Sequence, residues 1–325
     1  MSYYPPIAAL LVTLSLIAVI LASRFGNKLQ DIPNERSLHS VPVPRIGGVG
    51  LMAGVLSGWA FMVTFLAWWL ALPLLALFIV SLLDDLRGLP VRVRLPVHLV
   101  AATLLVVGSS LLASHGLLLA LGALLLTVWL TNLYNFMDGS DGLAGGMALF
   151  GFAMYGIAAL IHQNDTLATA NFTISAAALG FLFYNFHPAR VFMGDAGSIP
   201  LGFLSAAMGL WGWQQGCWPS WFPLLVFSPF IVDASVTLAK RTLRGVKITE
   251  AHREHYYQRA VQMGWSHRDV ALVEYGLMLG SGGTALLALD RALPWQALLA
   301  WGGIYGVLMV SVDTVWKKFK RAHHA

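Results

Sequence analysis

Charged residues are scarce in this chain of 325 residues: they form 11% of it, whereas hydrophobic residues form 58%. Soluble globular proteins carry about 25% charged residues. The composition therefore excludes an ordinary soluble enzyme and predicts an all-α polytopic membrane protein, which has the lipid bilayer as a partner. The net charge of +5 does not indicate a nucleic-acid partner, because basic residues in a membrane protein mark its topology.

Cysteine is nearly absent as well. Cys217 is the single cysteine, which excludes an internal disulfide and says nothing about the redox compartment. The N-terminus has neither a basic segment nor a small-residue cleavage site, so we expect an uncleaved first span. The sequence has no evident internal repeat or low-complexity tract, and residues 1–325 are interpreted as one integral-membrane domain.

Long apolar runs predict about eleven membrane-spanning helices, since one span needs roughly 20 mostly apolar residues. The expected spans are 6–23, 47–65, 68–83, 96–113, 117–134, 145–161, 167–185, 198–213, 221–239, 271–288 and 295–314. All but one of the 20 lysines and arginines then lie on one side, and only Arg291 lies opposite. Basic residues mark cytoplasmic loops. The N-terminus is therefore predicted outside, with the C-terminus and a large loop at 240–270 in the cytoplasm.

Glycines recur at every fourth position in the second expected span. Gly50, Gly54 and Gly58 lie on one helical face, where small residues allow two helices in lipid to approach closely. No strand precedes them, so close helix packing is a better interpretation than a nucleotide-binding loop.

Five aspartates stand where hydrophobic spans end, all on the predicted cytoplasmic side. They are Asp84, Asp85, Asp138, Asp141 and Asp195. An acid in or near the bilayer is costly, which makes it a functional candidate. Carboxylates gathered on one face indicate a metal-assisted enzyme that works at that face.

A polar repeat follows the fifth span. Asn132, Asn135, Asp138 and Asp141 recur every three residues, which at helical pitch predicts one shared face. The glycines that follow allow a phosphate to approach the backbone. A polar turn with helix caps is the alternative interpretation, whereas the spacing of an EF-hand is missing.

Asp195 stands in a glycine-flanked loop before the eighth span. Its carboxylate suits Mg²⁺, which favours one or two carboxylates together with phosphate oxygens. The N–H groups of Gly197 and Ser198, at a helix start, are expected to suit a phosphate.

Asp84 and Asp85 end the third span side by side. Adjacent helical positions point about 100° apart, so the two side chains are expected to serve different partners. Arg94 follows closely, and an acid–base cluster that only anchors the helix is the alternative.

The 240–270 loop holds His252, Arg253 and His255 in a basic stretch. Arginine binds phosphate bidentately, so this cluster suggests an anionic ligand. A solvated loop that only obeys the charge rule is the alternative. A zinc site is less well supported, because no cysteine or acidic ligand stands at a standard spacing.

Five ordered segments between residues 36 and 259 together resemble a known family. They are RSLHSVPVPRIGG, LLDD, NFMDGSDGLAGG, YNFHPARVFMGDAGSIPLG and the His/Arg loop. The resemblance is to the polyprenyl-phosphate N-acetylhexosamine-1-phosphate transferases of the MraY/WecA type, in glycosyltransferase family 4. The HREHYYQR stretch looks most like the WbpL-like enzymes that initiate O-antigen synthesis.

The resemblance implies ten or eleven helices and a cytoplasmic active site in the bacterial inner membrane. It implies transfer of a sugar-1-phosphate from a UDP-N-acetyl sugar to undecaprenyl phosphate, with release of UMP. The sugar is expected to be an N-acetylated hexosamine or 6-deoxyhexosamine, and the cofactor Mg²⁺, with Mn²⁺ as a substitute. A homodimer stays open.

The resemblance also assigns roles to individual residues. Asp195 and Asn135 match the metal ligands, and Asp84 and Asp85 match the catalytic pair near the lipid phosphate. The residues that match or are expected to form substrate contacts are Asn135, Asp138, Asp141, Asn185, Phe192, Arg94, His252, Arg253 and His255. Of these, Phe192, Asn185 and Asp141 match the uracil site.

Two alternatives remain at this stage. One direct displacement and a covalent aspartyl intermediate fit the residues equally. A nucleotide-sugar or lipid-linked-sugar transporter is the competing class, but transporters tend to carry polar sites at the bilayer midplane between repeated halves, and here the acids lie toward the cytoplasmic ends of their spans.

Overall fold

A computed structural model describes residues 2–23, 29–33, 38–39, 41–247, 252–290 and 294–323. These residues form helices almost throughout, with one two-stranded sheet. The elements are α1 (Tyr4–Ala22), β1 (Gln30–Asp31), β2 (Val43–Pro44), α2 (Gly47–Trp59), η2 (Ala60–Phe65), α3 (Trp68–Arg87), α4 (Val91–Gly108), α5 (Leu111–Phe136), α6 (Leu143–Ile161), α7 (Asp165–Asn185), α8 (Asp195–Gln214), α9 (Trp221–Val226), α10 (Ser228–Leu243), α11 (Tyr256–Gln262), α12 (His267–Leu287) and α13 (Pro294–His323).

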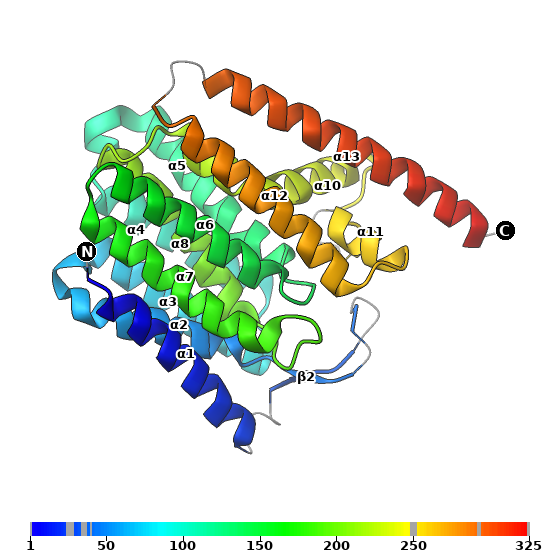
Figure 1. Cartoon of the computed structure of the whole chain (residues 1–325), viewed down its shortest axis with the longest axis horizontal. Coiled ribbons are helices and arrows are strands. Elements are labelled where there is room, and N and C mark those ends of the chain that lie inside the picture. Colours follow the sequence, from blue (N-terminus) through cyan, green and yellow to red (C-terminus); the bar gives the residue numbers. More distant parts are fainter. Residues whose placement is uncertain are drawn as a thin grey trace.

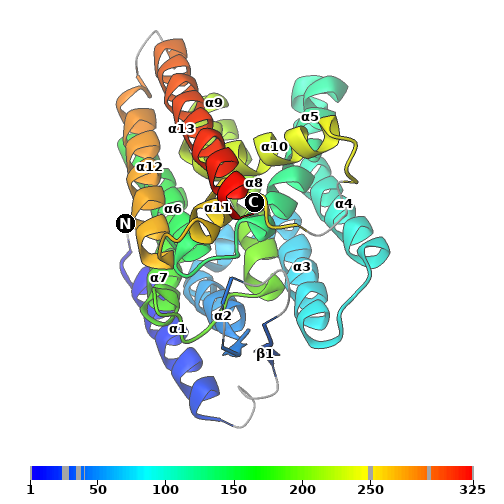
Figure 2. The ribbon, with the colours of Figure 1, turned by 90° about the vertical axis from the view of Figure 1, so that its right-hand side faces the viewer.

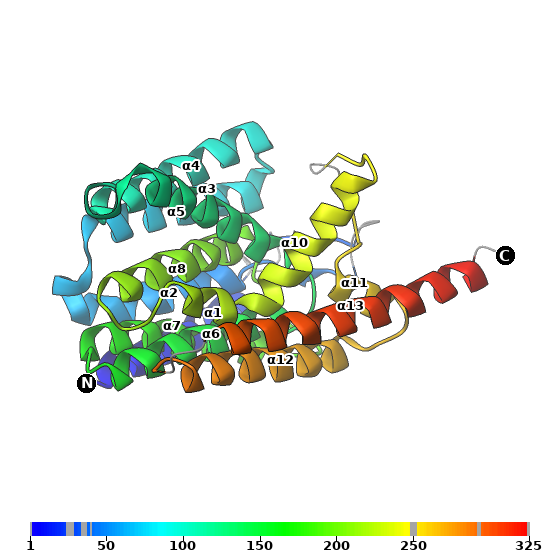
Figure 3. The same cartoon turned by 90° about the horizontal axis from the view of Figure 1, so that it is seen from above.

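The helices surround α8, which contacts α2, α3, α5 and α6. Seen from above, α3, α4 and α5 form one side of the bundle, and α6, α12 and α13 lie on the other (Figure 3). Small residues let α8 pack this closely. A Cβ atom at Gly202 would lie 2.6 Å from the carbonyl oxygen of Leu130. This packing brings the end of α5 beside the start of α8.

Within the described part of the chain, eight helices are long and apolar enough to cross a membrane: α1, α3, α4, α5, α6, α7, α12 and α13. The all-α polytopic class is thereby confirmed. The helix α8 is not among them, although a span was expected at 198–213. Because α8 is enclosed by other helices, it has less need of an apolar, lipid-facing surface. The count of eleven and the orientation stay predictions, and Arg291 lies outside the described residues.

The expected single span at 221–239 is wrong in detail, because two helices occupy it. The helix α9 ends at Val226 and α10 begins at Ser228. Pro229 explains the break, since proline has no N–H to donate and its ring excludes a continuous helix before it. The 240–270 segment is also partly helical: it contains the end of α10, all of α11 and the start of α12.

The two-stranded sheet lies before α2, and backbone hydrogen bonds join β2 and the start of α2 to the loop that precedes α8. The strands β1 and β2 are antiparallel. The backbone N–H of Phe192 donates to Pro44, and the N–H groups of Gly47 and Gly48 donate to Phe192 and Met193. The hairpin, α11 and the C-terminus all lie at one end of the molecule (Figure 1), which faces the viewer in Figure 2.

The glycine repeat in α2 packs against α1, as the spacing predicted. A Cβ atom at Gly50 would lie 2.3 Å from the Ile17 side chain, and one at Gly54 would lie 2.0 Å from Thr13 Oγ1. The third glycine, Gly58, lies against the backbone of Pro5 in the same way, at 2.5 Å.

Replacing Gly54 by leucine is therefore expected to destabilise the protein by about 1–3 kcal/mol, because overpacking forces neighbouring atoms apart. Thermal unfolding of the purified protein in detergent measures this. The control is Gly122→Leu in α5, where an added Cβ atom meets nothing within 4 Å. Equal unfolding midpoints for the two variants would contradict the packing.

Candidate active site

Four of the five predicted aspartates gather at the end of the bundle that holds the hairpin and α11. Asp84 and Asp85 lie in the last turn of α3, and Asp195 is the first residue of α8. Asp138 follows α5 and lies close enough for the Asp195 and Asp85 carboxylates to influence its ionisation. The predicted convergence of separate segments is thus present in the tertiary structure.

Arg94 joins two of these carboxylates from the first turn of α4. Its Nη1 atom donates to Asp84 Oδ2 at 2.6 Å and to Asp195 Oδ2 at 3.0 Å. The side chain of Asp84 is 8% exposed and that of Arg94 is 31% exposed. One guanidinium therefore fixes the Asp195 carboxylate relative to the buried Asp84, and the Asp195 side chain stays 22% exposed to a ligand.

Asp85 contacts the backbone at the start of α8 instead. Its Oδ1 accepts from the N–H of Asp195 at 3.0 Å, and its Oδ2 accepts from the N–H of Ala196 at 2.9 Å. The prediction that the two adjacent aspartates have different partners is confirmed. The alternative, in which they only anchor α3 in the interface, does not explain these contacts with α8.

The predicted phosphate contact at this helix start is wrong. The N–H groups of Gly197 and Ser198 both donate to the carbonyl oxygen of Gly194, at 3.1 Å each. The two preceding N–H groups are taken by Asp85. The start of α8 thus holds a carboxylate of the protein itself, which is the anion that a helix N-terminus attracts.

The four carboxylates leave an excess of negative charge. Burial and the nearby Asp195 and Asp85 carboxylates raise the pKa of Asp138 well above its usual range. Arg45 opposes this effect from the segment after β2, where it also pairs with Asp31 Oδ1 at 2.6 Å. Arg94 and Arg45 thus offset only part of the negative charge of this cluster, and Arg45 is shared with Asp31. A divalent cation bound here would offset more of it.

The predicted common face of Asn132, Asn135, Asp138 and Asp141 is only partly correct. The helix α5 ends at Phe136, so the helical repeat does not continue to the two aspartates. Asn135 Oδ1 accepts from Ser198 Oγ at 2.8 Å, which places this amide beside the first turn of α8. Asn132 donates to the backbone of Val128.

Asp141 turns away from the other aspartates. Its Oδ2 is 2.7 Å from His187 Nδ1 and accepts from the N–H of Ala189 at 3.1 Å. His187 in turn stacks on His267, with ring centroids 5.8 Å apart. His267 Nδ1 is 2.8 Å from Ser140 Oγ. This second polar cluster fixes the loop after α5 against the loop before α8.

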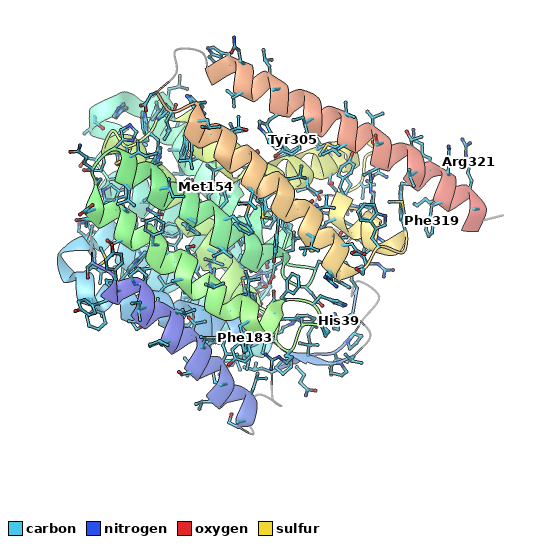
Figure 4. All side chains as sticks on the ribbon, viewed as in Figure 1. His39, Met154, Phe183, Tyr305, Phe319 and Arg321 are labelled. Atoms are coloured by element: carbon cyan, nitrogen blue, oxygen red, sulfur yellow. The ribbon has the colours of Figure 1, made fainter. Side chains whose placement is uncertain are left out.

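The other two residues of the expected uracil site, Asn185 and Phe192, lie close by. Asn185 is buried; it accepts from the Gly142 N–H and donates to the Val191 carbonyl, both at 2.9 Å. The Phe192 ring is partly exposed and meets His39 edge to face at 4.8 Å. Figure 4 shows His39 at the same end of the molecule as Phe319 and Arg321.

The His/Arg loop lies against the end of α5. Tyr257 donates its hydroxyl to the Phe136 carbonyl at 3.0 Å. His255 is buried, with its ring stacked on those of Phe136 and Tyr257. Asp233 in α10 accepts from the N–H groups of Tyr256 and Tyr257. The described part of the loop therefore packs firmly beside the end of α5 that carries Asn135.

Within this loop the three predicted residues differ in exposure. His252 packs on His255 at 4.9 Å between ring centroids. Burial, His255 and Arg241 lower the pKa of His252 to about 4, so its ring is neutral at neutral pH. Arg253 is exposed. Of these three, Arg253 is the residue best placed to bring a positive charge to a ligand from solvent.

Three residues with clear roles in this arrangement are not among the predicted site residues. Arg45 stands in the segment RSLHSVPVPRIGG, where its charge next to prolines is a signal for it. His187 stands in YNFHPARVFMGDAGSIPLG, but nothing in its spacing links it to His267. Asp233 caps α11 from α10, a role that depends on tertiary packing.

The donor atoms at this site suit Mg²⁺, and they do not suit a metal ion whose ligands all come from the protein. Among the described residues no three His, Cys, Asp or Glu side chains form a ready ligand set. Mg²⁺ is commonly bound by one or two carboxylates together with water and substrate phosphates. Asp195 and the Asn135 amide, with Asp138 nearby, fit such a partial set.

Comparison with known proteins bears on the family of the chain. The profile of glycosyl transferase family 4 matches residues 65–212, which contain α3 to α7, most of α8 and all four clustered aspartates. A probable undecaprenyl-phosphate N-acetylglucosaminyl 1-phosphate transferase of Bacillus subtilis is 29% identical over 291 residues, covering 83% of this chain and 81% of its own.

Two further relatives agree. A decaprenyl-phosphate N-acetylglucosaminephosphotransferase of Mycobacterium tuberculosis is 29% identical, covering 79% of this chain and 74% of its own. A phospho-N-acetylmuramoyl-pentapeptide-transferase of Moorella thermoacetica is 52% identical over 87 residues, which are 27% of this chain and 26% of its own.

The helical membrane fold and these matches define an integral-membrane glycosyl transferase of family 4. Within that family, the relatives are named as polyprenyl-phosphate N-acetylglucosamine and N-acetylmuramoyl-pentapeptide phosphotransferases, which supports the MraY/WecA type.

Proposed function

We propose that this protein transfers a sugar-1-phosphate from a UDP-N-acetyl sugar to undecaprenyl phosphate in the inner membrane, with its active site facing the cytoplasm. The observation that carries the proposal is the arginine bridge: Arg94 joins Asp84 to Asp195 at the end of the bundle where the segments of the family motif meet. The names of the relatives, which act on polyprenyl phosphates, support the same reaction.

The proposed reaction is an in-line displacement at phosphorus. An oxygen of the lipid phosphate bonds to the phosphorus next to the sugar, while the bond from that phosphorus to the bridging oxygen breaks and UMP leaves. Charge neutralisation and positioning are the main catalytic requirements of phosphoryl transfer. Arg94 and Arg45 supply fixed positive charge beside the carboxylates. We favour one direct displacement, because both oxygens of Asp85 are engaged by the backbone at the start of α8.

Mg²⁺ is the proposed cofactor, with Mn²⁺ as a substitute. Asp195 and Asn135 would hold it, and it would neutralise charge on the diphosphate oxygens. Burial and the neighbouring Asp195 and Asp85 carboxylates raise the pKa of Asp138, and a cation would relieve the repulsion between these carboxylates. Asp84 is the residue proposed to orient the lipid phosphate or accept its last proton.

We propose that Phe192 stacks on the uracil, with Asn185 and Asp141 shaping the site around it. The contacts support an indirect part for the two polar residues, because their side chains hold the backbone at Gly142, Val191 and Ala189. Phe192 is partly exposed, whereas Asn185 and Asp141 are buried.

Phe192→Ala is therefore expected to weaken UMP and the UDP-sugar alike, by about 1–3 kcal/mol or roughly five- to 150-fold, the usual range for a base stacked on an aromatic ring. The inhibition constant of UMP and the KM of the UDP-sugar measure this. Phe61→Ala, at a ring that is 68% exposed in η2, is the control. A change in the KM of the UDP-sugar without a change in the inhibition constant of UMP would show that Phe192 contacts a part of the substrate other than the nucleotide.

The sugar is proposed to be read by the loop with His252, Arg253 and His255. Support comes from its ordered packing beside the end of α5 and from the exposure of Arg253. The relatives that match most of the chain are named for N-acetylglucosamine, which favours that sugar. The HREHYYQR variant favours a 6-deoxy sugar, and with it a part in the synthesis of O-antigen and lipopolysaccharide.

An assay of the purified protein tests the function. Undecaprenyl phosphate, Mg²⁺ and a panel of UDP-sugars are supplied, and release of UMP is measured. We expect UMP only when both substrates are present, with an N-acetylated sugar preferred. Exchange of residues 252–259 with those of an N-acetylglucosamine-specific relative should change the ranking of sugars. No UMP with any member of the panel would contradict the proposal.

A further inference from the structure

Both oxygens of the Asp85 carboxylate are used by the backbone at the start of α8. They accept the N–H groups of Asp195 and Ala196 at 3.0 and 2.9 Å. These groups begin a helix and have no carbonyl partner within it. Asp85 thus acts as a helix cap supplied by another helix, and one of the two residues that it holds is the proposed metal ligand.

The residue before Asp195 is shaped around the same carboxylate. Gly194 has a φ of 72°, in the region that side chains rarely adopt. A Cβ atom at this position would lie 2.8 Å from Asp85 Oδ2. The loop therefore admits the carboxylate only because residue 194 is glycine, and two independent features converge on one contact.

Asp84 differs in its surroundings. One of its oxygens accepts from the Arg94 guanidinium, which also contacts Asp195. The other accepts from the backbone N–H of Leu89, within its own turn. Asp84 is thus linked to the side chain of Asp195, whereas Asp85 is linked to its backbone.

We infer that Asp85 is a positioning residue, which holds the start of α8 so that the Asp195 carboxylate faces the metal and the diphosphate, and that Asp84 is the member of the pair that acts on substrate. The inference rests on the proposed function and departs from the sequence prediction, in which both aspartates were catalytic. Residues that orient a metal ligand commonly change metal affinity by about ten- to 100-fold when they are replaced.

The test measures metal binding directly as well as turnover. Binding of Mn²⁺ to the full-length protein in detergent is followed by electron paramagnetic resonance, without substrates. Asp85→Asn should raise the Kd for Mn²⁺ by about tenfold or more, while turnover recovers in large part at saturating Mn²⁺. Asp84→Asn should bind Mn²⁺ nearly as well as the wild type and lose turnover at every metal concentration.

A second variant separates position from charge. Gly194→Ala keeps every carboxylate but displaces Asp85, so it should weaken Mn²⁺ binding as Asp85→Asn does. The control is Asn164→Ala, which removes the side-chain cap of α7, a 3.0 Å bond to the Leu167 N–H. It lies at the far end of α7 from Asn185, and it should lower the unfolding midpoint without changing the Kd for Mn²⁺.

The outcomes are distinct. If Asp85→Asn binds Mn²⁺ normally and loses turnover, Asp85 takes part in the reaction itself and the inference is wrong. If Asp85→Asn weakens binding but a folded Gly194→Ala does not, Asp85 acts by its charge and the positioning role is also wrong. If the wild-type protein neither binds Mn²⁺ nor releases UMP, the proposed function fails, and the inference fails with it.

Discussion

Replacing Asp195 by asparagine is expected to lower turnover by about a thousandfold while the protein still inserts and folds. Loss of a metal ligand removes several kcal/mol of transition-state stabilisation, and about 4 kcal/mol corresponds to a thousandfold. Asparagine keeps the size of the side chain and its oxygen facing Arg94, so the packing around α8 should persist. UMP release at saturating Mg²⁺ measures turnover, and chromatography with thermal unfolding in detergent measures folding.

The chain offers a matched control. Asp165 is the first residue of α7, as Asp195 is of α8. It lies at the end of the bundle opposite to the candidate site, which is at the Asn185 end of α7. Asp165→Asn should leave turnover close to that of the wild type. EDTA should stop the reaction of the wild type, and Mn²⁺ should restore it. Activity of Asp195→Asn within about tenfold of the wild type would refute the metal-ligand assignment.

Replacing Arg94 by alanine is expected to lower kcat/KM by about thirty- to 150-fold. The change leaves the Asp84 and Asp195 carboxylates without their shared partner, at 2.6 and 3.0 Å in the wild type. Removing one member of a buried ion pair destabilises its surroundings by about 3–5 kcal/mol. We expect a loss of transition-state stabilisation of similar size. Since Arg94 is about a third exposed, solvent screening reduces this to about 2–3 kcal/mol.

Arg92→Ala is the control for this prediction, because Arg92 is exposed on the same turn of α4. Arg94→Lys keeps the charge but lacks the rigid fork of the guanidinium, so intermediate activity is expected. Equal kinetics for Arg94→Ala and Arg92→Ala would mean that the bridge contributes to neither substrate binding nor the reaction.

The sequence alone predicted the helical membrane class and the set of aspartates at the ends of the spans. Apolar runs separated by short polar segments require a helical membrane fold, and aspartates at span ends are too costly to persist by chance. The glycine repeat in α2 likewise predicted a close contact, because its spacing depends on helical geometry alone. These features depend on local sequence alone, so they can be predicted without knowing which other segments pack against them.

The failures of prediction concern where local patterns end. The helical repeat through Asn132 and Asn135 stops at Phe136, and Asp138 and Asp141 then turn to different partners. The break before Pro229 divides one expected span into two helices. Spacing in the sequence assumes that a helix continues, and only the backbone conformation shows where it does not.

The sequence by itself therefore determined the membrane class, the family motifs and the residue types available for chemistry. The tertiary structure decided which of them meet. Asp85 and Asp195 are separated by 110 positions in the chain, yet they share a hydrogen bond, because close packing of α3 on α8 brings the end of one helix to the start of the other. Whether a carboxylate meets a guanidinium, a backbone N–H or a substrate depends on that packing, since hydrogen bonds act only over about 3 Å.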